Sequence, residues 1–362
     1  MTSARRILIL ILTGAGLILA ADHVPIRLYE LEYFRSDPPA YHPTVMKRLI
    51  GHIVAPDAGD ISGTLQARSA LSILRMAGLY AALSAAASIL GYPRGLWAFG
   101  IFSLMPPAIP YLVRLDPWMD SVSFVFIAIF FLSAANRAEG KKIAIFYAAA
   151  GLFTGLAIDS KLTSALTIVP FAALHFFRLR PQPLIRLRPQ PLMVSLSNHE
   201  RVGEVAPIGN LGLNKRLIFF SAGMATAALT QINWILHPSQ AAGHVAYWSS
   251  ANAALTALPV GYAPAAIFSA VPATILLLAG FGVIRAGRDK TVWASALLAG
   301  VPIIFFMFYR TFNPDGFRHL YLVLPFLAVP AADALAKFRP SFKIGFLAAW
   351  ISELLLKPPF SF

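Results

Sequence analysis

Two carboxylates stand among aromatic side chains near the N-terminus of this chain. Glu30 and Glu32 are interleaved with Tyr29, Tyr33 and Phe34. Aromatic faces stack on sugar rings, and carboxylates accept protons or hydrogen bonds from sugar hydroxyls, so the segment suits a carbohydrate. The alternative is a solvated acidic surface beside an aromatic belt at the level of the lipid headgroups, and the composition fits both interpretations.

Further ionisable residues of both signs follow at the ends of apolar runs. They are Arg114, Asp116 and Asp120, then Asp159 and Lys161, then the charged residues and histidines of 237–262 and 310–319. Ionisable groups at membrane depth are unfavourable, and those that persist usually line a functional site. Any one of them is also explained as a loop residue in contact with water. Their gathering on one side of the membrane, inferred below, favours a site.

The elements that carry these residues are apolar helices. The chain has 362 residues, of which 57% are hydrophobic and 13% are charged, and its mean hydropathy is +0.67. This composition leaves too little polar surface for a soluble globule. Apolar runs lie near 7–21, 71–90, 96–113, 122–135, 143–157, 162–177, 217–235, 263–284, 292–308, 320–336 and 344–356. They predict an all-α, polytopic membrane bundle of about eleven transmembrane helices, within a range of about ten to twelve.

The distribution of basic residues predicts the orientation. With the N-terminus in the cytoplasm, lysine and arginine dominate the cytoplasmic loops, whereas bases and acids balance in the periplasmic ones. This asymmetry explains the net charge of +14 without nucleic acid, which we exclude as a partner. The first run, preceded by Arg5 and Arg6, fits a signal anchor and a cleaved signal peptide alike. The expected location is the inner (plasma) membrane of a bacterium, with the polar clusters on the periplasmic face.

The chain divides into two transmembrane halves around an insert. The N-terminal half, 1–177, includes a long first periplasmic loop, 22–70, with an amphipathic interfacial helix expected near 42–54. The C-terminal half is 216–362. Between them, 178–215 carries the heptapeptide Arg-Leu-Arg-Pro-Gln-Pro-Leu twice, and proline at this density predicts a disordered cytoplasmic loop without chemistry. A basic tether to lipid headgroups is the alternative.

The order of several short motifs resembles the GT-C glycosyltransferases, the polytopic class that contains protein O-mannosyltransferases and bacterial transferases, including aminoarabinose transferases, that use polyprenyl-phosphate sugars. The motifs are spread over most of the chain. They are Asp22-His23, Ala40-Tyr41-His42-Pro43, Ala67-Arg-Ser-Ala-Leu-Ser72, Arg114-Leu-Asp116-Pro-Trp-Met-Asp120, Gly155-Leu-Ala-Ile-Asp-Ser-Lys161 and Arg318-His-Leu-Tyr-Leu-Val-Leu-Pro325.

The resemblance implies roles for particular residues. Asp22 is the expected base that deprotonates the acceptor, with Glu30 and Glu32 as competitors, and Asp120, rather than Asp116, matches the family's second aspartate. Cations would hold the leaving phosphate. The candidates for binding the donor phosphate or the substrate are Asp116, Lys161, Arg310, Arg318 and His42. The implied donor is a lipid-linked sugar, and the acceptor is a glycan, a lipid or a protein.

Other functions and cofactors stay open. The absence of cysteine excludes thiolate metal sites, and we predict no metal centre, although oxygen ligands from Asp22 and Asp120 could hold Mg²⁺ or Mn²⁺. The family's glutamate is replaced by His23, its His-Pro-Pro by His-Pro-Thr, and no soluble domain is expected after the last helix, so an inactive homologue is one alternative. A transporter or lipid flippase is another, because Pro106 and Pro107 suggest a broken helix.

Overall fold

The computed structural model describes residues 8, 11–12, 14–16, 19, 23–26, 28–31, 61–90, 94–103, 105, 113–115, 117–136, 138–161, 164–176, 212–229, 236–239, 242–243, 246, 262–287, 289–308 and 323–356. Within this part the secondary structure is entirely helical, which confirms the expected all-α class. The helices are α2 (Leu28–Leu31), α4 (Ile61–Leu90), α5 (Arg94–Ser103), α7 (Pro117–Ala135), α8 (Lys141–Ser160), α9 (Ala165–Phe176), α10 (Leu213–Ala228), α13 (Tyr262–Ala270), α14 (Ala273–Arg285), α15 (Lys290–Phe308), α16 (Leu324–Lys337) and α17 (Pro340–Leu356).

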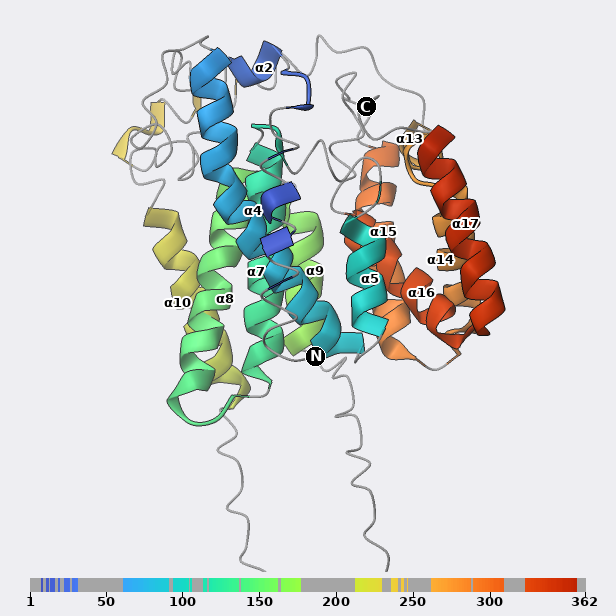
Figure 1. The fold of residues 1–362 in the computed structure, drawn as a ribbon. Helices are drawn as coiled ribbons and strands as arrows, with labels where there is room; N and C mark the ends of the chain where they lie inside the picture. The colour runs from blue at the N-terminus through green and yellow to red at the C-terminus, as the bar shows by residue number, and fades with distance from the viewer. Residues whose placement is uncertain are drawn as a thin grey trace, which may run out of the picture.

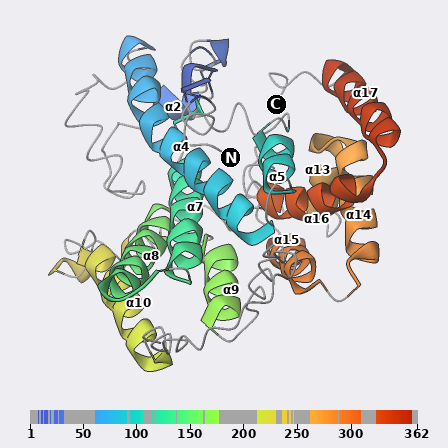
Figure 2. The same cartoon turned by 60° about the horizontal axis from the view of Figure 1, so that its bottom comes forward.

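The helices form two groups joined by α4. Helices α7 to α10 pack together on one side, and α5 with α13 to α17 on the other, while α4 runs between them and contacts both α7 and α5 (Figures 1 and 2). Helix α2 lies beside the start of α4, at one end of the bundle (Figure 1). We call this end the α2 end. Helix α7 ends, and α8 begins, at the opposite end (Figure 1).

The polarity of the bundle is inverted relative to a water-soluble protein. Large aliphatic side chains point outward, and Leu277 and Ile284 are 73% and 82% exposed, whereas arginines 68 and 75 are buried. Exposed apolar surface on this scale is costly in water and favourable in lipid. Two described helices, at 61–86 and 141–160, are long and apolar enough to cross a membrane, and a bent pair makes a third. The bundle is therefore consistent with a membrane protein, and the count of about eleven spans stays a prediction.

Glycines set the closest helix contacts. A Cβ atom added to Gly151 of α8 would lie 1.9 Å from the carbonyl oxygen of Phe220 in α10, and one added to Gly223 of α10 would lie 2.0 Å from the carbonyl oxygen of Ala148. No side chain fits in these gaps, so the two backbones meet directly, as small residues allow in membrane helices. Gly151 and Gly223 therefore serve the packing of α8 against α10.

Two helix boundaries differ from the apolar runs. Helix α4 begins at Ile61 rather than near 71, so the segment 61–70, which we placed in the first loop, is helical. The single run expected at 263–284 is broken, because α13 and α14 meet at an angle of 119°. Pro272 stands at the break as the N-cap of α14. Proline lacks an N–H group and restricts the residue before it, which explains the break.

Glu353 of α17 caps the start of α14 across this break. Its carboxylate accepts hydrogen bonds from the backbone N–H groups of Ala273 at 3.0 Å and Thr274 at 3.1 Å, and from the Thr274 hydroxyl. We expect Glu353→Ala to lower the free energy of unfolding by about 1 kcal/mol, the usual effect of losing a helix N-cap. Thermal unfolding in detergent measures this, with the exposed Glu139→Ala as the matched control. Equal stability of the two variants would contradict the capping role.

The described basic residues that we assigned to the cytoplasm gather at the end opposite to α2. They include Arg94 at the start of α5, Lys141 at the start of α8, Arg285 at the end of α14 and Lys337 at the end of α16. These residues therefore share one end of the bundle. Which end faces the cytoplasm stays a prediction.

Single introduced cysteines test this orientation, because the chain has no native cysteine. Lys141 and His237 are both exposed, and the topology places Lys141 in the cytoplasm and His237 in the periplasm. We expect an impermeant maleimide to label His237→Cys in intact cells and Lys141→Cys only after lysis. The reverse pattern would invert the topology. Gln190→Cys, in the insert, should behave as Lys141→Cys does.

Candidate active site

Five charged side chains are buried together near the α2 end. They are Glu30, Arg68, Arg75, Arg114 and Asp120, and each is at most 3% exposed. Glu30 belongs to α2, the first two arginines to α4, Arg114 to the segment before α7, and Asp120 to the first turn of α7. We call these five residues the charged cluster. Segments from three separate parts of the sequence meet there.

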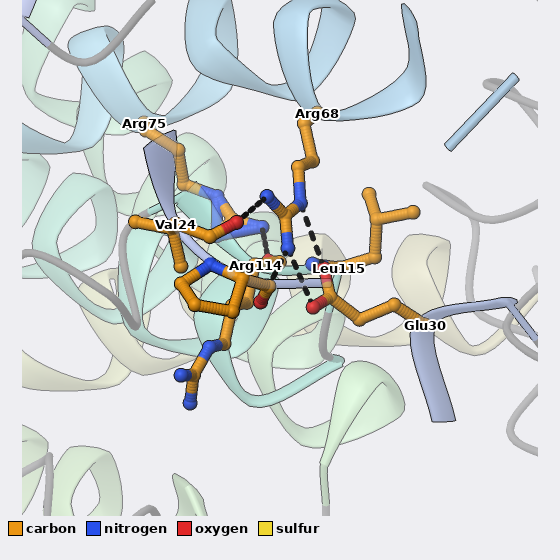
Figure 3. Close-up of polar contacts among 7 residues, drawn as sticks. Val24, Glu30, Arg68, Arg75, Arg114 and Leu115 are labelled. Carbon is orange, nitrogen blue, oxygen red and sulfur yellow. Dashed lines mark hydrogen bonds and ion pairs between the residues drawn. The ribbon is translucent and has the colours of Figure 1, made fainter. Parts of the chain in front are cut away.

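Glu30 and Arg68 form the central ion pair. Arg68 Nε donates to Glu30 Oε2 at 2.9 Å, and Arg68 Nη2 donates to Glu30 Oε1 at 2.6 Å, which is a bidentate arrangement. The N–H group of Leu115 also donates to Glu30 Oε2, at 2.9 Å. Both carboxylate oxygens of Glu30 are therefore engaged, and α2 is held against α4 and against the segment before α7 (Figure 3).

Arg68 also fixes the chain that precedes α2. Its Nη1 atom donates to the carbonyl oxygen of Val24 at 2.7 Å, and its Nη2 atom to that of Pro25 at 3.3 Å. Figure 3 shows the Arg68 side chain lying between this segment and Glu30. One side chain of α4 thus anchors the residues immediately after Asp22 and His23.

Arg75 and Asp120 form the second ion pair. Arg75 Nη2 donates to Asp120 Oδ1 at 3.1 Å and to the carbonyl oxygen of Arg114 at 3.3 Å. Asp120 lies in the first turn of α7, where the helix dipole favours a negative charge. Arg75 lies two helical turns after Arg68 in the sequence of α4, and such a spacing places both on one face of the helix.

Two ion pairs hold the charged cluster together. Burial of charge is costly unless the charges are paired, and buried charges in a membrane bundle usually mark a binding or catalytic site. The interior cavity of about 150 Å³ lies elsewhere, between α4, α5, α7, α9, α15 and α16, and its mainly apolar wall includes none of the five residues.

The structure brings together two of the residues expected from the sequence, Glu30 and Asp120. Lys161, a third expected residue, is the C-cap of α8 and is partly buried. Helix α8 begins at the end of the bundle opposite to α2, so Lys161 at its C-terminus lies toward the α2 end. The other candidates, Asp22, Glu32, His42, Asp116, Arg310 and Arg318, lie outside the described residues, as do the interfacial helix near 42–54 and most of the insert. His23 is exposed.

Sequence reasoning did not identify Arg68 and Arg75 as site residues. The apolar run was expected to begin near 71, which left Arg68 in a loop, and Arg75 was passed over as one charge in an apolar stretch. A signal was available: two arginines seven positions apart in one helix share a face. Intramembrane arginines of this kind are functional candidates by default.

The metal prediction stays open. Among the described residues, no three side chains of histidine, aspartate or glutamate come together in a way that could hold a metal ion. Asp22, which the sequence pairs with Asp120 for Mg²⁺ or Mn²⁺, is not among them.

Comparisons with known proteins show the fold. No protein-family model matches the sequence, and no curated protein matches it significantly. The chain is similar to the crystal structure of ArnT from Cupriavidus metallidurans bound to undecaprenyl phosphate, with a TM-score of 0.66 and 14% identity, over 96% of this chain and 63% of that chain. The apo state of the same protein matches with a TM-score of 0.64 and the same identity and coverage.

The likeness covers nearly all of this chain, which itself spans 63% of the length of ArnT. ArnT has the GT-C fold. The expected fold class is thereby confirmed at the level of the GT-C architecture, and at 14% identity the likeness concerns the fold alone.

Proposed function

We propose that this chain is a membrane glycosyltransferase that moves a sugar from a polyprenyl-phosphate-linked donor to a glycan, lipid or protein acceptor at the periplasmic face of the inner membrane. The observation that carries the proposal is a buried cluster of arginines and carboxylates at one end of a bundle with the GT-C fold. Undecaprenyl phosphate bound to ArnT, the protein of similar fold, supports a lipid-linked donor.

The proposed reaction needs one base and several cations. A hydroxyl oxygen of the acceptor attacks the anomeric carbon, the bond from that carbon to the phosphate oxygen breaks, and the polyprenyl phosphate leaves with the electron pair. The hydroxyl proton passes to a carboxylate. Positive groups stabilise the charge that develops on the leaving phosphate. Lys161, Arg310 and Arg318 are proposed for this role, with Asp116 and His42 as further substrate-binding candidates.

Asp22 is the carboxylate that we propose as the base. Both oxygens of Glu30 already accept hydrogen bonds from Arg68 and Leu115, so proton transfer to Glu30 would compete with a strong ion pair. Glu30 is better suited to hold α2 in place. Val24 and Pro25, which follow Asp22 closely in the sequence, are anchored by Arg68. Glu32 remains the alternative base, and Asp120, held by Arg75, would orient substrate hydroxyls.

A transporter or flippase is the alternative, and the break between α13 and α14 is the observation closest to it. Transporters use the N-termini of broken helices to bind substrate. Here the backbone N–H groups at the start of α14 already donate to Glu353. Because the protein's own carboxylate occupies this helix end, the break is better explained as a feature of packing.

The two functions differ in what happens to the lipid. Purified protein in proteoliposomes is given a polyprenyl-phosphate sugar labelled in the sugar, together with a membrane extract as the source of acceptors. A transferase converts the labelled lipid into a new species on chromatography. A flippase moves the lipid between leaflets without changing it, and that result would replace the proposal with the alternative.

A further inference from the structure

The two arginines of α4 in the charged cluster differ in how their donors are used. Each of the three nitrogens of Arg68 donates to an acceptor, either Glu30 or the carbonyl oxygens of Val24 and Pro25. Arg75 donates only through Nη2, to Asp120 and to the Arg114 carbonyl. Its Nε and Nη1 atoms have no hydrogen-bond partner in the part of the chain that the structure describes.

Arg75 is only 1% exposed, so these donors cannot be satisfied by bulk water. A buried donor without an acceptor is unfavourable, more so when it belongs to a charged group. Structural arginines avoid this by saturating their donors, as Arg68 does. Arg75 thus differs from Arg68: its guanidinium is held in place by Asp120, but two of its nitrogens donate no hydrogen bond to the described residues.

The surroundings of Arg75 favour an anion as the missing acceptor. Asp120 accepts a hydrogen bond from Nη2 and fixes the side chain. The first turn of α7, which carries Asp120, also presents the positive end of a long helix. The guanidinium carries a permanent positive charge, so an anion makes a stronger hydrogen bond with these donors than a neutral sugar hydroxyl or a water molecule does.

We propose that Arg75 binds the phosphate of the lipid donor through an unused N–H group of its guanidinium, beside the start of α7. The inference rests on the proposed function and deepens it, because Arg75 is none of the cations nominated by family resemblance. Arg75 would hold the donor before transfer and stabilise the polyprenyl phosphate after the bond to the sugar breaks. Asp120 would position Arg75 in addition to any contact of its own with the sugar.

Binding of radiolabelled undecaprenyl phosphate to the purified full-length protein in nanodiscs tests the proposal. Arg75→Lys keeps a positive charge opposite Asp120 but removes the guanidinium donors. We expect the affinity for undecaprenyl phosphate to fall about ten- to a hundredfold, the loss typical of a hydrogen bond between charged groups. Arg94→Lys is the matched control, since Arg94 is also ion-paired but lies at the opposite end; its affinity should equal that of the wild type.

A second variant guards against misfolding. Arg75→Gln combined with Asp120→Asn removes both charges of the ion pair, so neither charge is left buried without its partner. The affinity of this double variant for undecaprenyl phosphate should also fall. Unchanged affinity in a folded Arg75→Lys or in the double variant would overturn the proposal. Competition by inorganic phosphate at concentrations equal to those of the lipid would overturn the assignment to the lipid donor and favour a free phosphate. Weak competition supports the lipid.

The outcome separates this inference from the proposed function. If the wild type transfers sugar but the Arg75 variants bind undecaprenyl phosphate as tightly as the wild type, the inference about Arg75 is wrong and the proposed function stands. Arg75-dependent binding without any sugar transfer would overturn the proposed function and leave Arg75 as a lipid-phosphate site.

Discussion

Replacing Arg68 by methionine is expected to lower the free energy of unfolding by about 3–5 kcal/mol, the usual cost of leaving one partner of a buried ion pair without the other. Glu30 is fully buried, and without Arg68 its carboxylate would lose both hydrogen bonds of the ion pair. The carbonyl oxygens of Val24 and Pro25 would also lose their donor. Reversible unfolding in mixed detergent micelles measures the loss.

The double variant is the informative control. Arg68→Met combined with Glu30→Gln removes both charges, so most of the lost stability should return, since replacing a whole buried pair costs far less than breaking it. Arg94→Met, at an ion pair whose arginine is 31% exposed, should cost much less than Arg68→Met. A single Arg68→Met variant within about 1 kcal/mol of the wild type would mean that the pair does not hold the first loop in place.

Asp22→Asn is expected to abolish sugar transfer, with turnover falling by about 10² to 10⁴, the usual effect of removing a general base. Asparagine keeps the shape of aspartate but cannot take up the proton of the acceptor. The protein should stay folded and keep its affinity for the lipid donor, so the loss falls on kcat rather than on donor binding. Turnover and donor affinity are measured on the same preparation.

Two glutamates of the first loop are the controls for this assignment. Glu32→Gln should retain activity. Glu30→Gln should weaken the ion pair with Arg68 and lower stability, and the fraction that is folded should still turn over. If Asp22→Asn turns over normally and Glu32→Gln is inactive, Glu32 rather than Asp22 is the base. If all three variants are active, none of these carboxylates of the first loop is the base.

The all-helical class and the GT-C fold could be predicted because apolar runs and the order of short motifs are local properties of the sequence. The glycines at 151 and 155 could also be assigned to packing, because small residues in an apolar helix have few other uses. Glu30 stood out as an acid among aromatic residues, and Asp120 as an acid at the end of an apolar segment. Their presence in one cluster follows the expectation that the polar residues of one face gather.

The partners of these acids could not be predicted with the same reasoning. Arg68 lies 38 residues from Glu30, and Arg75 lies 45 residues from Asp120, so no local pattern links them. The start of α4 was missed because residues 61–70 are too polar for an apolar run, although Thr64 and Arg68 in this stretch are buried against neighbouring segments. Tertiary contacts, rather than hydropathy, extend the helix.

The most direct test of the central claim is mass spectrometry of the lipid fraction after purified protein in nanodiscs has been incubated with a polyprenyl-phosphate sugar and a membrane extract that supplies acceptors. We expect free polyprenyl phosphate to accumulate in step with loss of the sugar-bearing donor, and we expect Asp22→Asn to stop this release without preventing donor binding. A donor that stays intact with the folded wild-type protein, or that is consumed equally by Asp22→Asn, would contradict the central claim.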